Sequence, residues 1–240
     1  MERTAVLIDG GYFTKCINQQ YGNMAAADMA TFVAKLCDSH IAFERISDLY
    51  RIFYYDCAPL EDKILLPISR KQLDLGQTPL ARYTRVLHKE LLKVRKVALR
   101  LGELTLNSRE PWVLKPRIQK ELVSGAIKIE DLTDECFKLN VRQKGVDMRI
   151  GLDISSLAYK RQVSQIVLVS GDSDFVPVAK LARREGLDVV LDPLGRHVNS
   201  LLEEHIDGVF DSSMCVEVEA TSIIASLSDV TDAPETSSLI

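Results

Sequence analysis

Short apolar runs alternate along this chain with longer segments whose apolar residues recur every three or four positions. The clearest run, residues 166–169, is wholly apolar and rich in β-branched residues, which predicts a strand buried on both faces. Further strands are predicted at residues 4–8, 51–55 and 187–191, and alternating apolar residues predict one at 97–106, with Gly102 marking a kink.

Segments with helical spacing lie between these strands. Helices are predicted at residues 11–22, 26–38, 83–96, 147–159, 175–185 and 197–205. Residues 107–140 are polar and mixed, and we expect them to form an excursion from the core. Strands that alternate with helices in this way predict an α/β fold with a parallel sheet and right-handed crossovers.

The length of 240 residues fits one domain with an insertion and a tail. We place the domain at residues 1–215, with residues 60–140 as a variable region that would contact the substrate. Residues 216–240 are rich in Ser, Thr and acidic side chains, and we expect a weakly ordered tail there. Nine of the 34 acidic residues and none of the 30 basic residues follow Arg196, which leaves residues 1–196 with a net charge of +5. A mildly basic body is compatible with a polyanionic partner.

Several classes of protein lack support in this sequence. No apolar run approaches the roughly 18–20 residues of a membrane span, and no basic and apolar leader precedes the first strand. The five cysteines are scattered, which fits reduced thiols and a cytoplasmic protein better than disulfides or a zinc site. The sequence also contains neither GxxxxGK[ST] nor HExxH.

Acidic residues stand where the predicted strands end. Asp172 and Asp174 follow the central strand through Ser170-Gly171, and Asp9 follows the first strand. Asp147 opens a helical segment just upstream. Because open α/β sheets bind ligands beyond the carboxyl ends of their strands, we expect these four acids to form one cluster.

Clustered carboxylates repel one another unless a cation neutralises them. Mg²⁺ or Mn²⁺ fits this role because both ions prefer oxygen ligands. One or two such ions can activate a water and stabilise the leaving oxygen of a phosphodiester. The cluster therefore predicts hydrolysis without a nucleophilic side chain.

Each acid also has a simpler structural interpretation. Asp147 and Asp174 are placed to be helix N-caps, and Asp9 before two glycines fits ordinary turn chemistry. Asp153 lies about 240° around the helix from Asp147, so we expect it behind the site or in a structural role. Lys144 would neutralise the cluster or grip a phosphate, or else be a solvated loop lysine.

A basic stripe lies within the predicted helix 83–96 and just before it. Its members follow steps of three, four, four and three residues: Arg82, Arg85, Lys89, Lys93 and Lys96. Such a stripe is usually a solvated helix face. The alternative is a track for a phosphate backbone that leads to the acidic site.

Four blocks of sequence resemble the NYN domain family, specifically its LabA-like bacterial branch. They are VLIDGGYF (6–13), QKGVDMRIGLD (143–153), VLVSGDSDFVPV (167–178) and REGLDVVL (184–191). The family is similar to PIN-domain nucleases, so the resemblance implies a PIN-like, Rossmann-like sheet with strand order 3-2-1-4-5 and helices on both faces. One departure is Tyr12, where many relatives carry Asn.

The resemblance further implies a metal-dependent ribonuclease that acts on RNA. Asp9, Asp147, Asp172 and Asp174 match the family's metal-binding acids, and Asp153 matches a further acid of the same helix. With Lys144 and Ser170, Asp153 would support the metal ligands from behind. We expect single-stranded RNA as the partner and no membrane, and the sequence leaves self-association open.

Two rival functions remain. The first is an RNA- or protein-binding regulatory module with the same fold and little turnover, although a pure binder gains nothing from a repulsive cluster. The second is a phosphatase-like hydrolase of small substrates. Phosphatases of the haloacid dehalogenase type carry DxDxT after the first strand, whereas GGYF follows Asp9 here.

Overall fold

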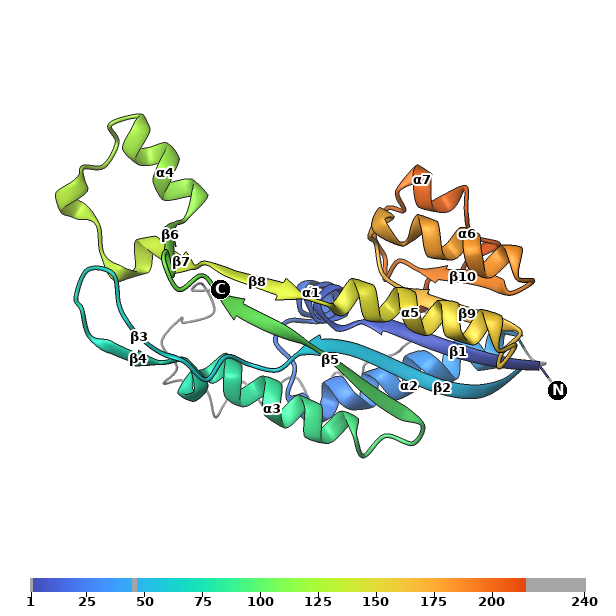
Figure 1. Cartoon of the computed structure of the whole chain (residues 1–240). Helices are drawn as coiled ribbons and strands as arrows, with labels where there is room; N and C mark the ends of the chain where they lie inside the picture. Colours follow the sequence, from blue (N-terminus) through green and yellow to red (C-terminus); the bar gives the residue numbers. More distant parts are fainter. Residues whose placement is uncertain (1, 45–46, 215–240) are drawn as a thin grey trace.

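The computed structural model describes residues 2–44 and 47–214, and in this part of the chain a seven-stranded sheet carries helices on both faces (Figure 1). The strand order is β11-β10-β9-β1-β2-β5-β8. The strands are β1 (Glu2–Asp9), β2 (Ser47–Cys57), β5 (Val97–Leu106), β8 (Val141–Lys144), β9 (Gln165–Val169), β10 (Asp188–Asp192) and β11 (Gly208–Val209). The predicted tail, residues 216–240, lies outside the described residues.

The sheet is mostly parallel, as the alternation of strands and helices predicted. The predicted strand order 3-2-1-4-5 differs from the observed order because two more strands join the sheet. β11 adds in parallel to β10, and β8 adds antiparallel to β5. Between these additions, the five strands β10-β9-β1-β2-β5 run in parallel.

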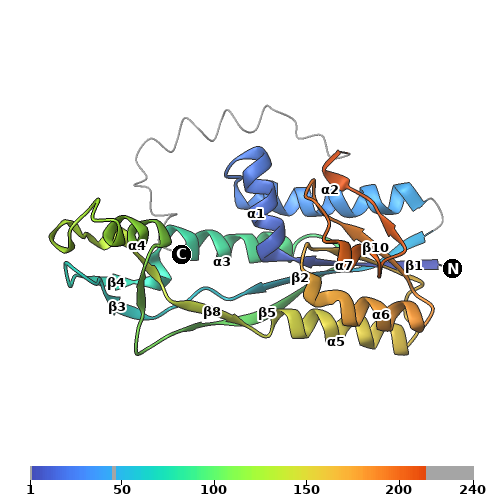
Figure 2. The ribbon, with the colours of Figure 1, turned by 90° about the horizontal axis from the view of Figure 1, so that it is seen from above.

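Each face of the sheet has its own set of helices (Figure 2). One face carries α1 (Gly10–Tyr21), α2 (Ala26–Glu44) and α3 (Pro79–Leu91). The other carries α5 (Val146–Tyr159), α6 (Val176–Arg184) and α7 (Ser200–Glu203). No helix in the described ranges is both long and apolar enough to span a membrane.

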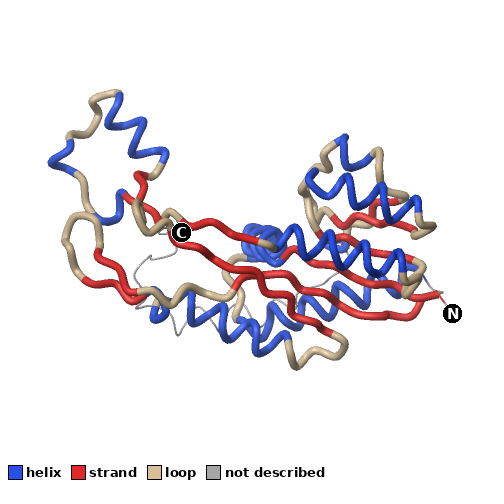
Figure 3. Tube along the Cα trace, in the orientation of Figure 1, coloured by secondary structure: helices blue, strands red, loops and turns tan. Residues whose placement is uncertain are grey.

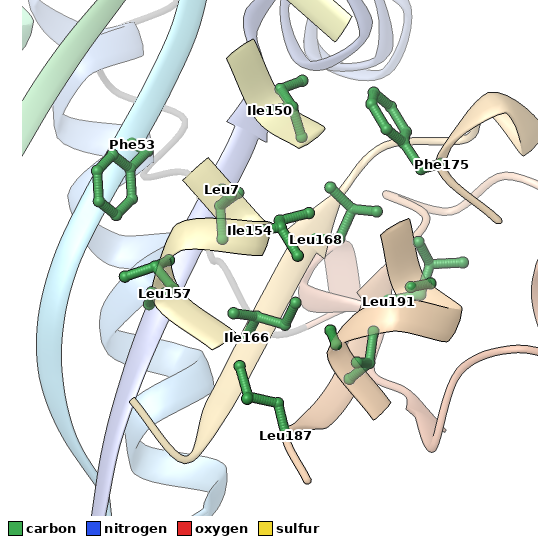
Figure 4. Close-up of a cluster of buried hydrophobic side chains, with 14 of the residues drawn as sticks. Leu7, Phe53, Ile150, Ile154, Leu157, Ile166, Leu168, Phe175, Leu187 and Leu191 are labelled. Atoms are coloured by element: carbon green, nitrogen blue, oxygen red, sulfur yellow. The ribbon is translucent and has the colours of Figure 1, made fainter. Parts of the chain in front are cut away.

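The first strand shows how the sequence supplies both cores. Successive side chains of a strand point to opposite faces. Leu7 of β1 packs into the core under α5 and α6, and Ile8 packs into the core under α1 and α2. Figure 4 shows Leu7 with Ile150 and Ile154 of α5 in the first of these cores. β1 is therefore buried on both faces, which positions Asp9 rigidly at its end.

The predicted helix 83–96 is wrong at both ends. Thr78 caps α3 by accepting the Ala81 N–H, and Pro79 stands in the first turn, so the helix begins earlier than its apolar periodicity suggested. It ends at Leu91 with Leu92 as the C-cap. Lys96 has a φ of 68°, in the left-handed region that a right-handed helix cannot contain.

Residues 63–74 and 107–140 form an arm that extends from the sheet (Figure 3). It contains β3 (Lys63–Leu65), β4 (Gln72–Asp74), β6 (Trp112–Leu114), α4 (Pro116–Val123), β7 (Phe137–Leu139) and the 3-10 turns η2 (Ile129–Asp131) and η3 (Asp134–Cys136). Trp112 Nε1 donates to the Leu65 carbonyl at 2.8 Å and joins its two parts. The segments α4, η2 and η3 bury no residue, so the arm adds little to the core.

Candidate carboxylate site

Asp9 ends β1 and caps α1, and these two roles fix its side chain. Its Oδ1 accepts the Tyr12 N–H at 3.1 Å, the usual contact of an N-cap carboxylate. The Gly11 N–H also stabilises the Asp9 carboxylate. The simple capping interpretation of Asp9 is therefore correct for Oδ1, and no ion pair with Asp9 forms in the described ranges.

Asp172 is held in the same way at the end of β9. Ser170 is fully buried, and its Oγ accepts the Asp172 N–H at 3.3 Å. Asp172 then caps the 3-10 turn η4 (Ser173–Phe175), where its Oδ1 accepts the Asp174 N–H at 2.9 Å. Asp172 and Asp174 are both exposed, so their remaining oxygens face solvent.

Asp147 reaches this edge of the sheet from another direction. β8 ends at Lys144, Gly145 turns the chain with a φ of 79°, and α5 begins at Val146. Asp147 is thus in the first turn of α5, and no cap hydrogen bond forms there. The expectation that Asp147 and Asp174 are the N-caps is not met, since Asp9 and Asp172 take that role.

The pKa values of Asp9 and Asp147 respond to the charges of the other acids, so these acids lie near one another. Burial raises the pKa of Asp9, and the charges of Asp147 and Asp172 raise it further against the lowering effect of the Tyr12 N–H. Burial also raises the pKa of Asp147, together with the charges of Asp172 and Asp174. The fold therefore brings carboxylates from β1, α5 and η4 to one edge.

The oxygens of these four carboxylates suit a hard divalent cation, but the side chains do not form a complete coordination shell. None of the four carboxylates has an ion-pair partner among residues 2–44 and 47–214. In the same ranges, no three His, Cys, Asp or Glu side chains converge closely enough to hold a metal ion. The chemistry of the oxygens fits Mg²⁺ or Mn²⁺, and Asp147 and Asp174 are exposed side chains that can change rotamer to approach Asp9 and Asp172.

The residues expected behind the acids have different surroundings. Asp153 Oδ2 accepts from Tyr55 OH and from Arg100 Nε, each at 2.9 Å. These contacts join α5 to β2 and β5, which is a structural role. Lys144 is exposed at the end of β8 and forms no ion pair with the described acids.

The basic stripe is divided by the end of α3. Arg82 and Lys89 are exposed on the helix, and Arg85 is half-buried because its Nη2 donates to the Gly76 carbonyl at 2.6 Å. Lys93 and Lys96 do not continue the helix face as predicted. Lys93 pairs with Glu90 at 2.6 Å, and Lys96 Nζ donates to the Leu49 carbonyl.

Two features near the site were not identified from the sequence. The ring of Tyr12 lies against Gly171, where an added Cβ would approach Tyr12 Cε2 to 2.7 Å, and its hydroxyl donates to the Pro193 carbonyl at 2.6 Å. The second feature is an Asp56–His88 pair, Oδ2 to Nε2 2.8 Å. The sequence feature that could have indicated this pair is a polar residue, Asp56, at the carboxyl end of the second strand.

A family model matches half of the chain: the NYN domain model covers residues 85–204. The chain belongs to the NYN domain family. The NYN match includes Asp147, Asp172 and Asp174 and starts inside α3, so Asp9 and β1 precede it. It places the chain among nuclease-like domains without distinguishing the LabA-like branch.

Solved structures add only distant likenesses to this NYN protein. One is a protein of unknown function, VPA0982 from Vibrio parahaemolyticus, with 15% identity, 88% of this chain and 92% of that chain covered, and a TM-score of 0.46. Another is Sir2 bound to an acetylated peptide, with 12% identity, 87% of each chain covered and a TM-score of 0.32. No curated protein matches the sequence significantly.

Proposed function

We propose that this NYN protein is a metal-dependent endoribonuclease of the PIN-like, LabA-like type. One observation carries the proposal: β1, α5 and η4 bring four carboxylates without ion-pair partners in the described ranges to one edge of the sheet, where burial and the charges of neighbouring acids raise the pKa values of Asp9 and Asp147. A fold gains no stability from such repulsion. The arrangement makes sense if a divalent cation is bound there during function.

The chain's own residues would hold and orient that cation. Asp9 and Asp172 would ligate through Oδ2, since Oδ1 of each is already fixed by a backbone N–H. Hydrogen bonds behind a ligating carboxylate set its direction in this way. Asp147 and Asp174 would complete the set. A bound Mg²⁺ or Mn²⁺ supplies activation of water and stabilisation of the leaving oxygen.

The test is cleavage of a 3′-labelled single-stranded RNA in Mn²⁺, Mg²⁺ or EDTA. Wild type should cut only with metal, and Asp172→Asn should lose at least about a hundredfold in rate, as expected for loss of a main electrostatic contributor. Asp38→Asn is the control, because Asp38 is exposed on α2 and is not among the charges that raise the pKa values of Asp9 and Asp147. Cleavage by Asp172→Asn at the wild-type rate would remove this site from the mechanism.

A second readout does not depend on turnover. Mn²⁺ at saturating concentration should raise the melting temperature of wild type, because a ligand that binds only the folded state stabilises it. The Asp9→Asn/Asp172→Asn double variant should show no such rise. An equal rise in both proteins would mean that the metal binds elsewhere.

The second candidate is an RNA-binding module with little turnover. The absence of three converging ligands among the described residues favours it. RNA binding without cleavage in any metal, and no thermal shift with Mn²⁺, would support this alternative.

A further inference from the structure

A hollow lies beside α3, on the face of the sheet opposite α5. It has a volume of about 530 Å³ and is lined by Ala58, Pro59, Glu61, Arg85, His88 and Lys89. This volume falls within the range of sites for small ligands. Neither the four acids nor the predicted metal involves this hollow.

His88, one of the lining residues, is held in place by a contact with Asp56. His88 is 8% exposed, and its Nε2 lies 2.8 Å from Asp56 Oδ2. A carboxylate only accepts hydrogen bonds, so Nε2 carries the proton. Asp56 also accepts the Cys57 N–H at 2.7 Å through Oδ1, which fixes the carboxylate itself. The imidazole is therefore held rigidly between β2 and α3.

Two cationic side chains stand beside His88 on the same helix face. Arg85, His88 and Lys89 are related by steps of three and four residues, which place side chains together on a helix. The Gly76 carbonyl anchors one arm of the Arg85 guanidinium, while Glu61 lies 3.7 Å from it. Lys89 is exposed and has no ion pair among the described residues, so two cationic side chains and one carboxylate, Glu61, line the hollow, while the Asp56 carboxylate is hydrogen-bonded to His88.

The Asp56–His88 pair and the strand end that holds Asp9 are close to each other. Tyr55 of β2 is the register partner of Asp9, and Asp56 is the next residue. Neighbouring strands are about 4.8 Å apart, so Asp56 lies close to the strand end that holds Asp9. The side chain of Asp56 points to the α3 face, as shown by its bond to His88. A strand of nucleic acid at this edge would therefore reach both places.

We propose that this hollow binds one nucleotide of a single-stranded RNA through its phosphate. Arg85 and Lys89 supply the charge, the Asp56–His88 pair fixes the imidazole, and Ala58 and Pro59 form an apolar wall for the sugar and base. The proposal deepens the proposed function, because it gives the ribonuclease a phosphate subsite beside its acids. It replaces the five-residue track of Arg82 to Lys96 with a localised site.

The experiment measures binding of a 3′-fluorescein decauridylate by anisotropy in EDTA. Since EDTA removes any metal, binding is measured independently of cleavage, and a failure of the nuclease proposal would not affect the result. Lys89→Gln should weaken binding about three- to tenfold at low salt. The slope of log K against log salt should become shallower by about 0.7, the value for one phosphate contact on a single strand.

Glu61→Gln should change the affinity for RNA in the opposite direction from Lys89→Gln. Glu61 is exposed and opposes an anion in the hollow, so its neutralisation should tighten binding about two- to threefold. Lys180→Gln is the matched control, because Lys180 is an exposed lysine on α6 across the sheet. Wild-type binding by both Lys89→Gln and Glu61→Gln would overturn the proposal, as would an equal loss in Lys180→Gln.

The 5′ end of the RNA can be changed to decide whether the bound phosphate is a terminal one or one within the strand. A 5′-phosphorylated decauridylate that binds more tightly than the 5′-hydroxyl form, with the difference lost in Lys89→Gln, would assign a terminal phosphate. Equal binding of the two forms, both weakened by Lys89→Gln, would assign a phosphate within the strand.

Discussion

At the residue scale, the site is built from carboxylates with two separate tasks. In Asp9 and Asp172, Oδ1 completes a helix or turn by accepting a backbone N–H, and neither carboxylate forms an ion pair in the described ranges. Asn serves almost equally well as an N-cap. Replacement by Asn therefore removes the charge and keeps the local fold, which makes these positions suitable for clean tests of function.

The raised pKa of Asp9 predicts a pH-dependent stability in metal-free protein. A carboxyl whose pKa is higher in the folded state contributes stability below its unfolded pKa of about 3.9, and this contribution is lost as the pH rises through the folded pKa. Asp9→Asn should therefore unfold at higher urea than wild type at pH 7 in EDTA, with the difference vanishing near pH 4. A lower urea midpoint for Asp9→Asn at pH 7 would contradict the raised pKa that burial and the neighbouring acids give Asp9, and Asp38→Asn is the control.

Asp153 should behave as a structural residue. Asp153→Asn removes the charge that pairs with Arg100 and weakens the hydrogen bond from Tyr55. A hydrogen bond to a charged group contributes about 1.5–3 kcal/mol, and the free energy of unfolding should fall within this range or below it, since Arg100 is partly exposed. Urea denaturation measures the loss. The thermal shift with Mn²⁺ should persist, whereas a lost shift would return Asp153 to the metal site.

At the element scale, the start of α1 is fixed by close packing against β2. A Cβ on Gly10 would lie 2.5 Å from the Tyr55 carbonyl and 2.6 Å from Tyr54 Cε1. Since a backbone atom cannot move aside cheaply, Gly10→Ala should destabilise the fold by about 1–3 kcal/mol or more.

Gly151→Ala is the matched change for Gly10→Ala. Gly151 lies within α5, and no atom outside the helix would meet an added Cβ within 4 Å. Alanine should then stabilise the helix by about 0.5–1 kcal/mol. Urea denaturation of the two variants should give shifts of opposite sign, and shifts of the same sign would contradict the packing at Gly10.

The elements that the sequence predicted well are those buried on both faces. The run at residues 166–169 and the acids after it could be identified because a parallel strand leaves an uninterrupted apolar pattern. The end of α3 could not, because Leu92 and Val94 continue the apolar spacing beyond the point where the backbone turns. The Asp56–His88 pair was also missed, since its partners are 32 residues apart and meet only in the folded chain.

At the scale of the whole molecule, the arm is an addition to a complete domain. The Asn107 N–H donates to the Asn140 carbonyl at 2.9 Å just beyond the paired strands β5 and β8. Replacing residues 108–139 with Asn-Gly, which favours a tight hairpin, should therefore lower the melting temperature by only a few degrees. RNA binding or the cleavage pattern should change, in line with a substrate-contacting region. Unfolding of this variant would show that the arm is part of the core.

The two ends of β5 pair differently, and Gly102 stands where the pairing changes. Val97 to Gly102 run parallel to β2, and Glu103 to Leu106 run antiparallel to β8. A Cβ on Gly102 would come within 2.6 Å of the Lys144 carbonyl, so the strand and the start of α5 are in close contact. Only Gly145 and Val146 separate β8 from Asp147. A displacement of the arm that moves β8 would consequently reach Asp147 through only these two residues. Binding at the arm and the position of Asp147 are therefore linked through the chain.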